Sequence, residues 1–147
     1  MTLLYDELTT GPLAAEIAPY IQQGSDGLIL EALERRDIPS KGDLETSKIK
    51  AYLFALGFWN TIKHSSSLAC EEAIDALTLF QTFELSNPVY LYRLTQVLDA
   101  LVAEPLLPDF AEENKQAILS MGDILISRVD QLGIRVSIYD IAQALRG

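Results

Sequence analysis

Hydrophobic residues recur along the chain at the three- and four-residue spacings that place side chains on one face of a helix. The stripes are Leu13, Ile17, Tyr20 and Ile21; Ile29, Ala32 and Leu33; Ile49, Tyr52, Leu53 and Leu56; Ala69, Ala73, Ala76, Leu77 and Phe80; Tyr90, Leu94, Val97, Leu98 and Leu101; Ile118, Met121, Leu125, Val129 and Leu132; and Ile138, Ile141, Ala142 and Leu145. No long alternating or β-branched run competes with them. The pattern therefore predicts an all-α fold.

Capping residues, prolines and glycines mark the expected ends of these helices. Asn87 before Pro88 is typical of a helix start, and Asp109 with Glu112 has the spacing of a capping box. Pro19 should kink or restart the first helix. Further starts are expected at Asp26, Asp43 and Ser137, ends at Gly57 and Gly133, and a loop over Asp37–Gly42. These boundaries predict a compact bundle of about seven short helices.

A length of 147 residues, 49% of them hydrophobic, suits one domain with a sizeable core. The sequence shows no internal repeat and no long linker, so we predict a single helical domain over residues 1–147. The longest unbroken apolar run, Ala51 to Leu56, is far shorter than the roughly 18 to 20 residues of a membrane span. The N-terminus lacks the features of a secretory signal, and we expect a protein of the cytoplasm or a virion.

Charge changes the expected partners, because the formal net charge is −10. An acidic surface repels phosphate backbones, so direct nucleic-acid binding is not expected. The charge is uneven: residues 1–34 carry −6, Arg35–Lys63 carry +3, His64–Glu113 carry −8, and Asn114–Gly147 carry +1. Acidic surfaces beside a basic one could orient a partner or a second copy of the chain. The simpler interpretation is that the charge keeps an apolar protein soluble.

The residues that usually perform catalysis are scarce. His64 is the only histidine, and Cys70, the only cysteine, is followed by two acidic residues that disfavour a thiolate. One histidine and one cysteine do not make a zinc site, and Glu71 with Asp75 is better explained by solvation than by a bound cation. No phosphate-binding loop or nucleophile motif is present. We therefore expect neither an enzyme nor a cofactor or metal.

Binding features are easier to find, and we select three. The aromatic pair Phe58 and Trp59 follows a helix-ending glycine; such a pair is often the edge of a core, whereas an exposed Trp would be an interface anchor. Tyr90, Leu91 and Tyr92 form a wider apolar group than one stripe requires. Glu71, Glu72 and Asp75 form an acidic face. The apolar excess could also leave a patch for a protein partner or another subunit, which favours a homo-oligomer.

Parts of the sequence resemble a group of small proteins encoded in tailed-bacteriophage genomes, often near virion and tail genes. The resemblance lies in Asp6-Glu7-Leu8 leading into Gly11-Pro12-Leu13, in Leu33–Pro39, and from Asn114 through Ile126–Gly133. It covers the two ends of the chain and leaves out Ala51–Pro108. These are helix and cap patterns, and the group brings no active site to transfer.

The resemblance implies a virion structural or assembly accessory at the head, neck or tail, acting through protein–protein contacts in many copies. The alternative is an acidic inhibitor of a host nucleic-acid-handling system, in which Glu71, Glu72 and Asp75 imitate phosphates. An enzyme would need carboxylates that converge in a pocket.

Overall fold

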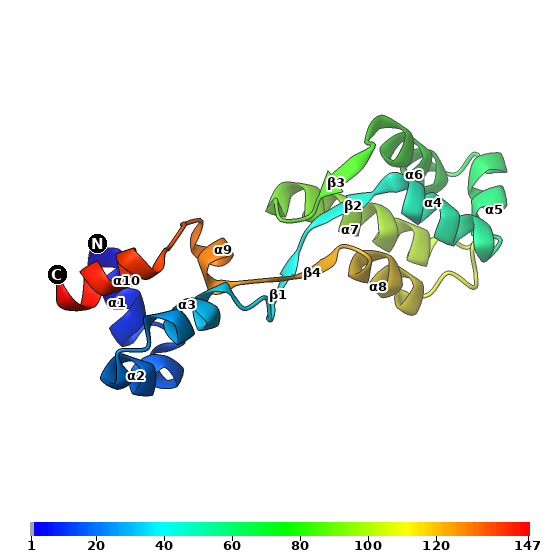
Figure 1. The fold of residues 1–147 in the computed structure, drawn as a ribbon. Helices are drawn as coiled ribbons and strands as arrows, with labels where there is room; N and C mark the ends of the chain where they lie inside the picture. Colours follow the sequence, from blue (N-terminus) through cyan, green and yellow to red (C-terminus); the bar gives the residue numbers. More distant parts are fainter. Residues whose placement is uncertain (1) are drawn as a thin grey trace. The chain divides into compact units, whose positions relative to one another are not determined.

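The computed structural model describes residues 2–147, and over these residues the chain forms ten helices and four short strands (Figure 1). The helices are α1 (Thr2–Thr10), α2 (Ala14–Gln23), α3 (Asp26–Glu34), α4 (Thr46–Ala55), α5 (Phe58–His64), α6 (Leu68–Leu79), α7 (Pro88–Ala103), α8 (Glu112–Ser120), α9 (Arg128–Leu132) and α10 (Ile138–Arg146). The strands are β1 (Ile38–Lys41), β2 (Asp43–Glu45), β3 (Thr82–Glu84) and β4 (Asp123–Ile126). The predominantly helical character predicted from the sequence is confirmed.

The purely α class and the count of about seven helices are wrong. A further helix, α1, precedes the first predicted one, Gly57 separates α4 from α5, and β4 divides the predicted helix over Asp109–Leu132 into α8 and α9. The strands were missed because three or four residues are too few to show a period. Where we expected a helix to begin at Asp43, β2 lies instead, and α4 begins at Thr46.

The chain divides into two compact units, and the first is built from both ends of the sequence. Unit 1 comprises the described residues up to Pro39 together with Leu125–Gly147. Both termini lie in it, beside α1 and α10 (Figure 1). Its buried cluster combines residues of α1, α2, α3 and α10: Leu4, Leu8, Ile17, Ile29, Ala32, Leu33 and Ile141. α2 runs through Pro19 without a second start.

A partly buried ion pair joins the two sequence ends of unit 1. Glu7 of α1 is only 7% exposed, and Arg128 at the start of α9 donates to both of its carboxylate oxygens, at 2.5 Å from Nε and 2.9 Å from Nη2. The carboxylate raises the pKa of Arg128 above its ordinary value, since the pair stabilises the charged guanidinium. A Cβ on Gly11 would lie 2.7 Å from the Glu7 carboxyl carbon, so this position needs glycine. The chain ends are therefore held by charge as well as by apolar contact.

Unit 2, Ser40–Ile124, has its own hydrophobic cluster between α4, α5, α6, α7 and α8. β2 and β3 pair antiparallel, with Leu44 opposite Phe83, and both side chains are buried in this cluster. Thr46 fixes the start of α4, because its backbone N–H and its hydroxyl both donate to the Gln81 carbonyl, at 2.9 and 3.1 Å. The stripes predicted for α6 and α7 are confirmed as their inner faces.

Helix caps were predicted with mixed success. Asn87 accepts a hydrogen bond from the Val89 N–H with Pro88 at the first helical position, and Ser137 caps α10, as expected. The predicted box of Asp109 and Glu112 is wrong. α8 begins at Glu112. The N–H of Ala111, the residue before it, donates to the side chain of Asn114 at 2.9 Å.

Removing one partner of the partly buried pair should destabilise unit 1. Arg128→Met leaves the Glu7 carboxylate buried without its partner, and we expect the free energy of unfolding to fall by about 3 kcal/mol. The double variant Glu7→Leu/Arg128→Met should recover most of this loss, because no unpaired charge remains. Urea titration followed by far-UV circular dichroism measures both effects. The control Arg135→Met, at an exposed arginine, should change stability by less than about 0.5 kcal/mol. Equal midpoints for Arg128→Met and wild type would contradict the role of the pair.

Because each unit has its own hydrophobic cluster, we expect a core substitution to destabilise only the unit that contains it. Trp59, the only tryptophan, packs against the unit 2 cluster, so its fluorescence reports that unit. Ile17→Ala should lower the stability of unit 1 by about 2–4 kcal/mol and leave the fluorescence midpoint unchanged, whereas Leu98→Ala should lower that midpoint. If both variants shift the fluorescence transition equally, the chain unfolds as the single domain predicted from the sequence.

Candidate protein-binding surface

The predicted aromatic pair lies where α4 turns into α5. Gly57 permits this turn because its φ of 82° is in the left-handed region, which disfavours other residues. Phe58 and Trp59 begin α5 and are both partly buried against the unit 2 cluster. The Phe58 ring meets the Phe110 ring edge-on, with centroids 5.1 Å apart. Both aromatics thus form the edge of the core, the first of the two interpretations offered above.

A small pocket opens beside this corner, and we call it the corner pocket. Its volume is about 170 Å³, and Leu56, Phe58 and the loop Leu106–Pro108 line it together with the polar residues Thr61 and Asp109. Leu56 and Leu106 are both more than half exposed. Leu56 was predicted to face the core, but the helix ends just before it. The pocket is of side-chain size, and most of its exposed lining is polar.

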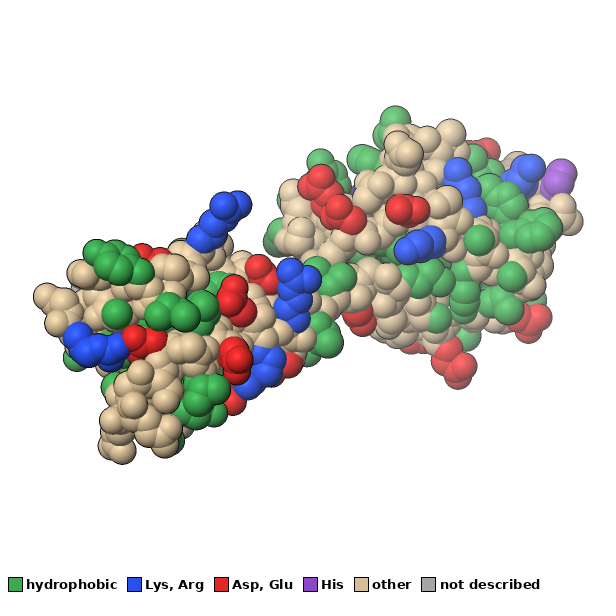
Figure 2. Space-filling model, in the orientation of Figure 1, with side chains coloured by type: hydrophobic (Ala, Val, Ile, Leu, Met, Phe, Trp, Pro, Cys, Tyr) green, Lys and Arg blue, Asp and Glu red, His purple; other side chains and the backbone are tan. Residues whose placement is uncertain are grey.

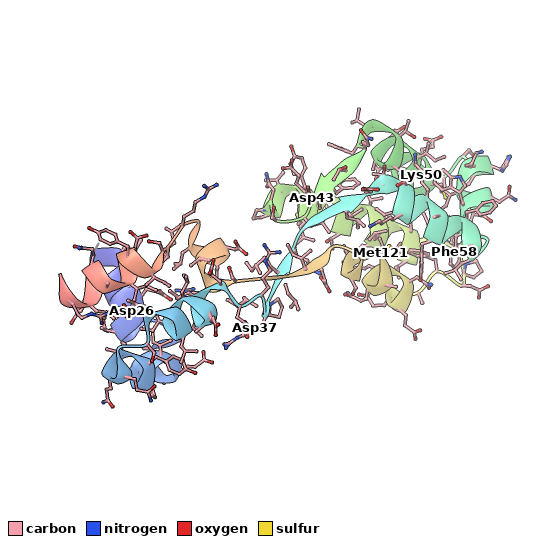
Figure 3. The ribbon with its side chains drawn as sticks, viewed as in Figure 1. Asp26, Asp37, Asp43, Lys50, Phe58 and Met121 are labelled. Carbon is pink, nitrogen blue, oxygen red and sulfur yellow. The ribbon has the colours of Figure 1, made fainter. Side chains whose placement is uncertain are left out.

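The outer surface of α4 and α5 carries positive charge and an exposed aromatic side chain. We call Lys48, Lys50, Phe54 and Lys63 the basic face; no acidic residue occurs between Thr46 and Ser67. Phe54 is 73% exposed and lies one turn after Lys50. In Figure 2, basic side chains over α4 and α5 lie among hydrophobic ones. Figure 3 shows Lys50 on α4 and Phe58 at the start of α5. Phe54 was missed, although its position off the Ile49–Leu53 stripe signals exposure.

The predicted acidic residues belong to a stripe along the outside of α6. Glu71 and Asp75 are exposed and Glu72 is partly buried. Leu68 and Leu79, 71% and 78% exposed, occupy the same side, because the offsets of 3, 7 and 11 residues from Leu68 fall close to whole helical turns. We call these five residues the acidic stripe. The carboxylates were predicted, whereas the two leucines were missed.

The third predicted group divides between core and surface. Tyr90 and Leu91, near the start of α7, pack partly buried against the unit 2 cluster, and the Tyr90 ring lies 5.9 Å from that of Phe80. Tyr92 is exposed, and its hydroxyl accepts a hydrogen bond from Gln96 at 3.0 Å. Only Tyr92, beside the exposed Val89, remains available to a partner.

Three charged residues elsewhere in unit 2 pair with one another. Lys115 of α8 lies 2.6 Å from Asp99 of α7 and 3.3 Å from Glu112. Asp99 raises the pKa of Lys115, and hydrogen bonds from Gln116 and Lys115 lower that of Glu112. By contrast, over residues 2–147 no ion pair within 4.0 Å involves a lysine of the basic face or a carboxylate of the acidic stripe. These two surfaces therefore present uncompensated charge to solvent.

The two residues considered above for catalysis, Cys70 and His64, are not part of these surfaces. Cys70 is buried in the unit 2 cluster, as predicted, and His64 is an exposed residue whose Nδ1 lies 2.8 Å from the Asn60 carbonyl oxygen. Within the part of the chain that the structure describes, no group of three or more His, Cys, Asp or Glu side chains could hold a metal ion. The described helices are all too short or too polar to cross a membrane.

No family model, curated protein or solved structure matches this chain.

The two phenylalanines at the α4–α5 corner should respond oppositely to truncation. Phe58→Ala removes the contact with Phe110 and should lower the free energy of unfolding by about 2 kcal/mol. Phe54→Ala removes a ring that is largely in solvent and should change it by less than about 0.5 kcal/mol. Far-UV circular dichroism in urea measures both. A loss of comparable size for Phe54→Ala would show that this ring packs within the chain and is not available for binding.

Proposed function

We propose that this chain is a non-enzymatic protein that acts through protein–protein contacts, as a structural or assembly accessory of a phage virion at its head, neck or tail. The single observation that carries the binding role is the exposure of large apolar side chains on helix surfaces, above all Phe54, Leu68 and Leu79. Exposed apolar groups beside charged ones are typical of surfaces that another protein covers. The virion assignment rests on the resemblance of the two ends of the chain to phage proteins.

A second candidate is an acidic inhibitor that imitates nucleic acid toward a host nuclease or polymerase. The unpaired carboxylates Glu71, Glu72 and Asp75 favour it, since they present adjacent negative charges along one helix. The leucines at both ends of the same stripe favour the assembly role instead, because a phosphate mimic has no need of exposed aliphatic side chains.

The assembly role predicts that particles purified from cells producing this chain contain it in a fixed ratio to the major structural proteins. Mass spectrometry of washed particles measures this ratio, and a host cytoplasmic protein of similar abundance serves as the control for carry-over. Light scattering should also show more than one copy per complex. Absence from the particles, together with a monomer at high concentration, would contradict the proposal. Capture of a host nuclease or polymerase, displaced by DNA and weakened steeply by salt, would favour the inhibitor.

A further inference from the structure

Unit 2 carries two exposed surfaces of opposite charge. The acidic stripe on α6 has three carboxylates and no base from Leu68 to Leu79, whereas the basic face on α4 and α5 has three lysines and no acid. Each surface also exposes large hydrophobic side chains, Leu68 and Leu79 on one and Phe54 on the other. Two protein surfaces that associate typically carry opposite charges, and both expose apolar groups.

We propose that the acidic stripe of one copy binds the basic face of a second copy of this chain. This inference deepens the proposed function, on which it rests, by naming the partner and the contact. The carboxylates of Glu71 and Asp75 meet Lys48 and Lys50 of the second copy, and the leucines of the stripe cover apolar surface around Phe54.

The dimensions of the two surfaces match. Leu68 and Leu79 are eleven residues apart on α6, which is about 16 Å along the helix axis, and the ten residues of α4 span about 15 Å. The outer side of α4 between its lysines carries the small exposed residues Ser47, Ala51 and Ala55. Small side chains let a second helix approach closely, so the larger leucines of α6 can reach the α4 surface.

The corner pocket lies at one end of this contact. It lies where α4 ends, and Leu56, Phe58 and Pro108 line it. An exposed leucine at one end of the acidic stripe can contact the apolar part of this lining, Leu56 and Phe58. The contact then places leucines against apolar side chains, with ion pairs around them, which is the arrangement of an apolar interface centre with a polar rim.

A second copy is the occupant favoured over an unrelated protein because both complementary surfaces occur on one chain. Each copy has one acidic stripe and one basic face, so a copy can bind through both surfaces at the same time. Such a contact gives a two-fold dimer if both surfaces engage the same neighbour, and a ring or an open filament if they engage different ones.

Charge reversal on each surface, followed by mixing, tests the contact. Sedimentation velocity of wild type should show reversible association. The variants Lys48→Glu/Lys50→Glu and Glu71→Lys/Asp75→Lys should each raise the dissociation constant at least about tenfold, because like charges then face one another. An equimolar mixture of the two should restore association to within about threefold of wild type, since reversed charges again meet opposite ones. Association in this mixture should weaken as the salt concentration is raised, because salt screens the interaction between the charges.

Matched controls change the same number of charges at exposed positions outside both surfaces. These are Arg93→Glu/Arg135→Glu and Glu31→Lys/Glu34→Lys, which should leave the dissociation constant within about threefold of wild type. Far-UV circular dichroism confirms that each variant is folded. A monomeric wild type at about 1 mM, or a mixture that associates no better than its components, would overturn the inference. If the chain is present in particles but charge reversal does not weaken its self-association, only the proposed contact is refuted. If the chain self-associates as proposed but is absent from particles, only the virion role is refuted.

Discussion

The fold of unit 1 depends on bringing the two ends of the sequence together. Glu7 and Arg128 are 121 positions apart, yet they form a partly buried ion pair. Closing so long a loop costs entropy, although the cost grows only slowly with length. The compensation comes from burying Leu8 and Ile141 in one cluster and from satisfying the charged pair. The intervening segment must therefore form a unit with a core of its own, which is what the cluster of unit 2 provides.

Local sequence predicted the elements that local physics determines. The stripes of α6 and α7 and the cap at Asn87 follow from residues within one or two turns, and the structure confirms them. The strands depend on distant partners instead: Leu44 is buried in β2 because Phe83 lies opposite it, almost forty residues away. Nothing near Asp43 signals that pairing, and its polar side chain resembles a helix cap. The split of α8 from α9 is likewise set by β4, which pairs with β1.

The candidate surface was predicted by its charge and misjudged in its apolar part. Glu71 and Asp75 were identified because carboxylates on a helix rarely face a core. Phe58 and Trp59 attracted attention as aromatics, yet they complete the core edge, and the exposed ring is Phe54. Helical geometry contains the missing signal, since Leu79 lies one turn beyond Asp75 and away from Leu77.

The acidic stripe places exposed leucines among carboxylates. It therefore contributes both to the apolar composition of the chain and to its net charge of −10. A purely apolar stripe on α6 would associate with any exposed hydrophobic surface, and Phe54 of every copy offers one. Glu71 and Asp75 oppose such contacts, because burying an unpaired carboxylate costs more than burying a leucine gains. A surface that brings cations to those carboxylates removes the penalty, and in the proposed contact the lysines of α4 beside the exposed Phe54 are those cations. In the proposed contact the charges therefore determine which surfaces meet, and the leucines add the apolar area that holds them together.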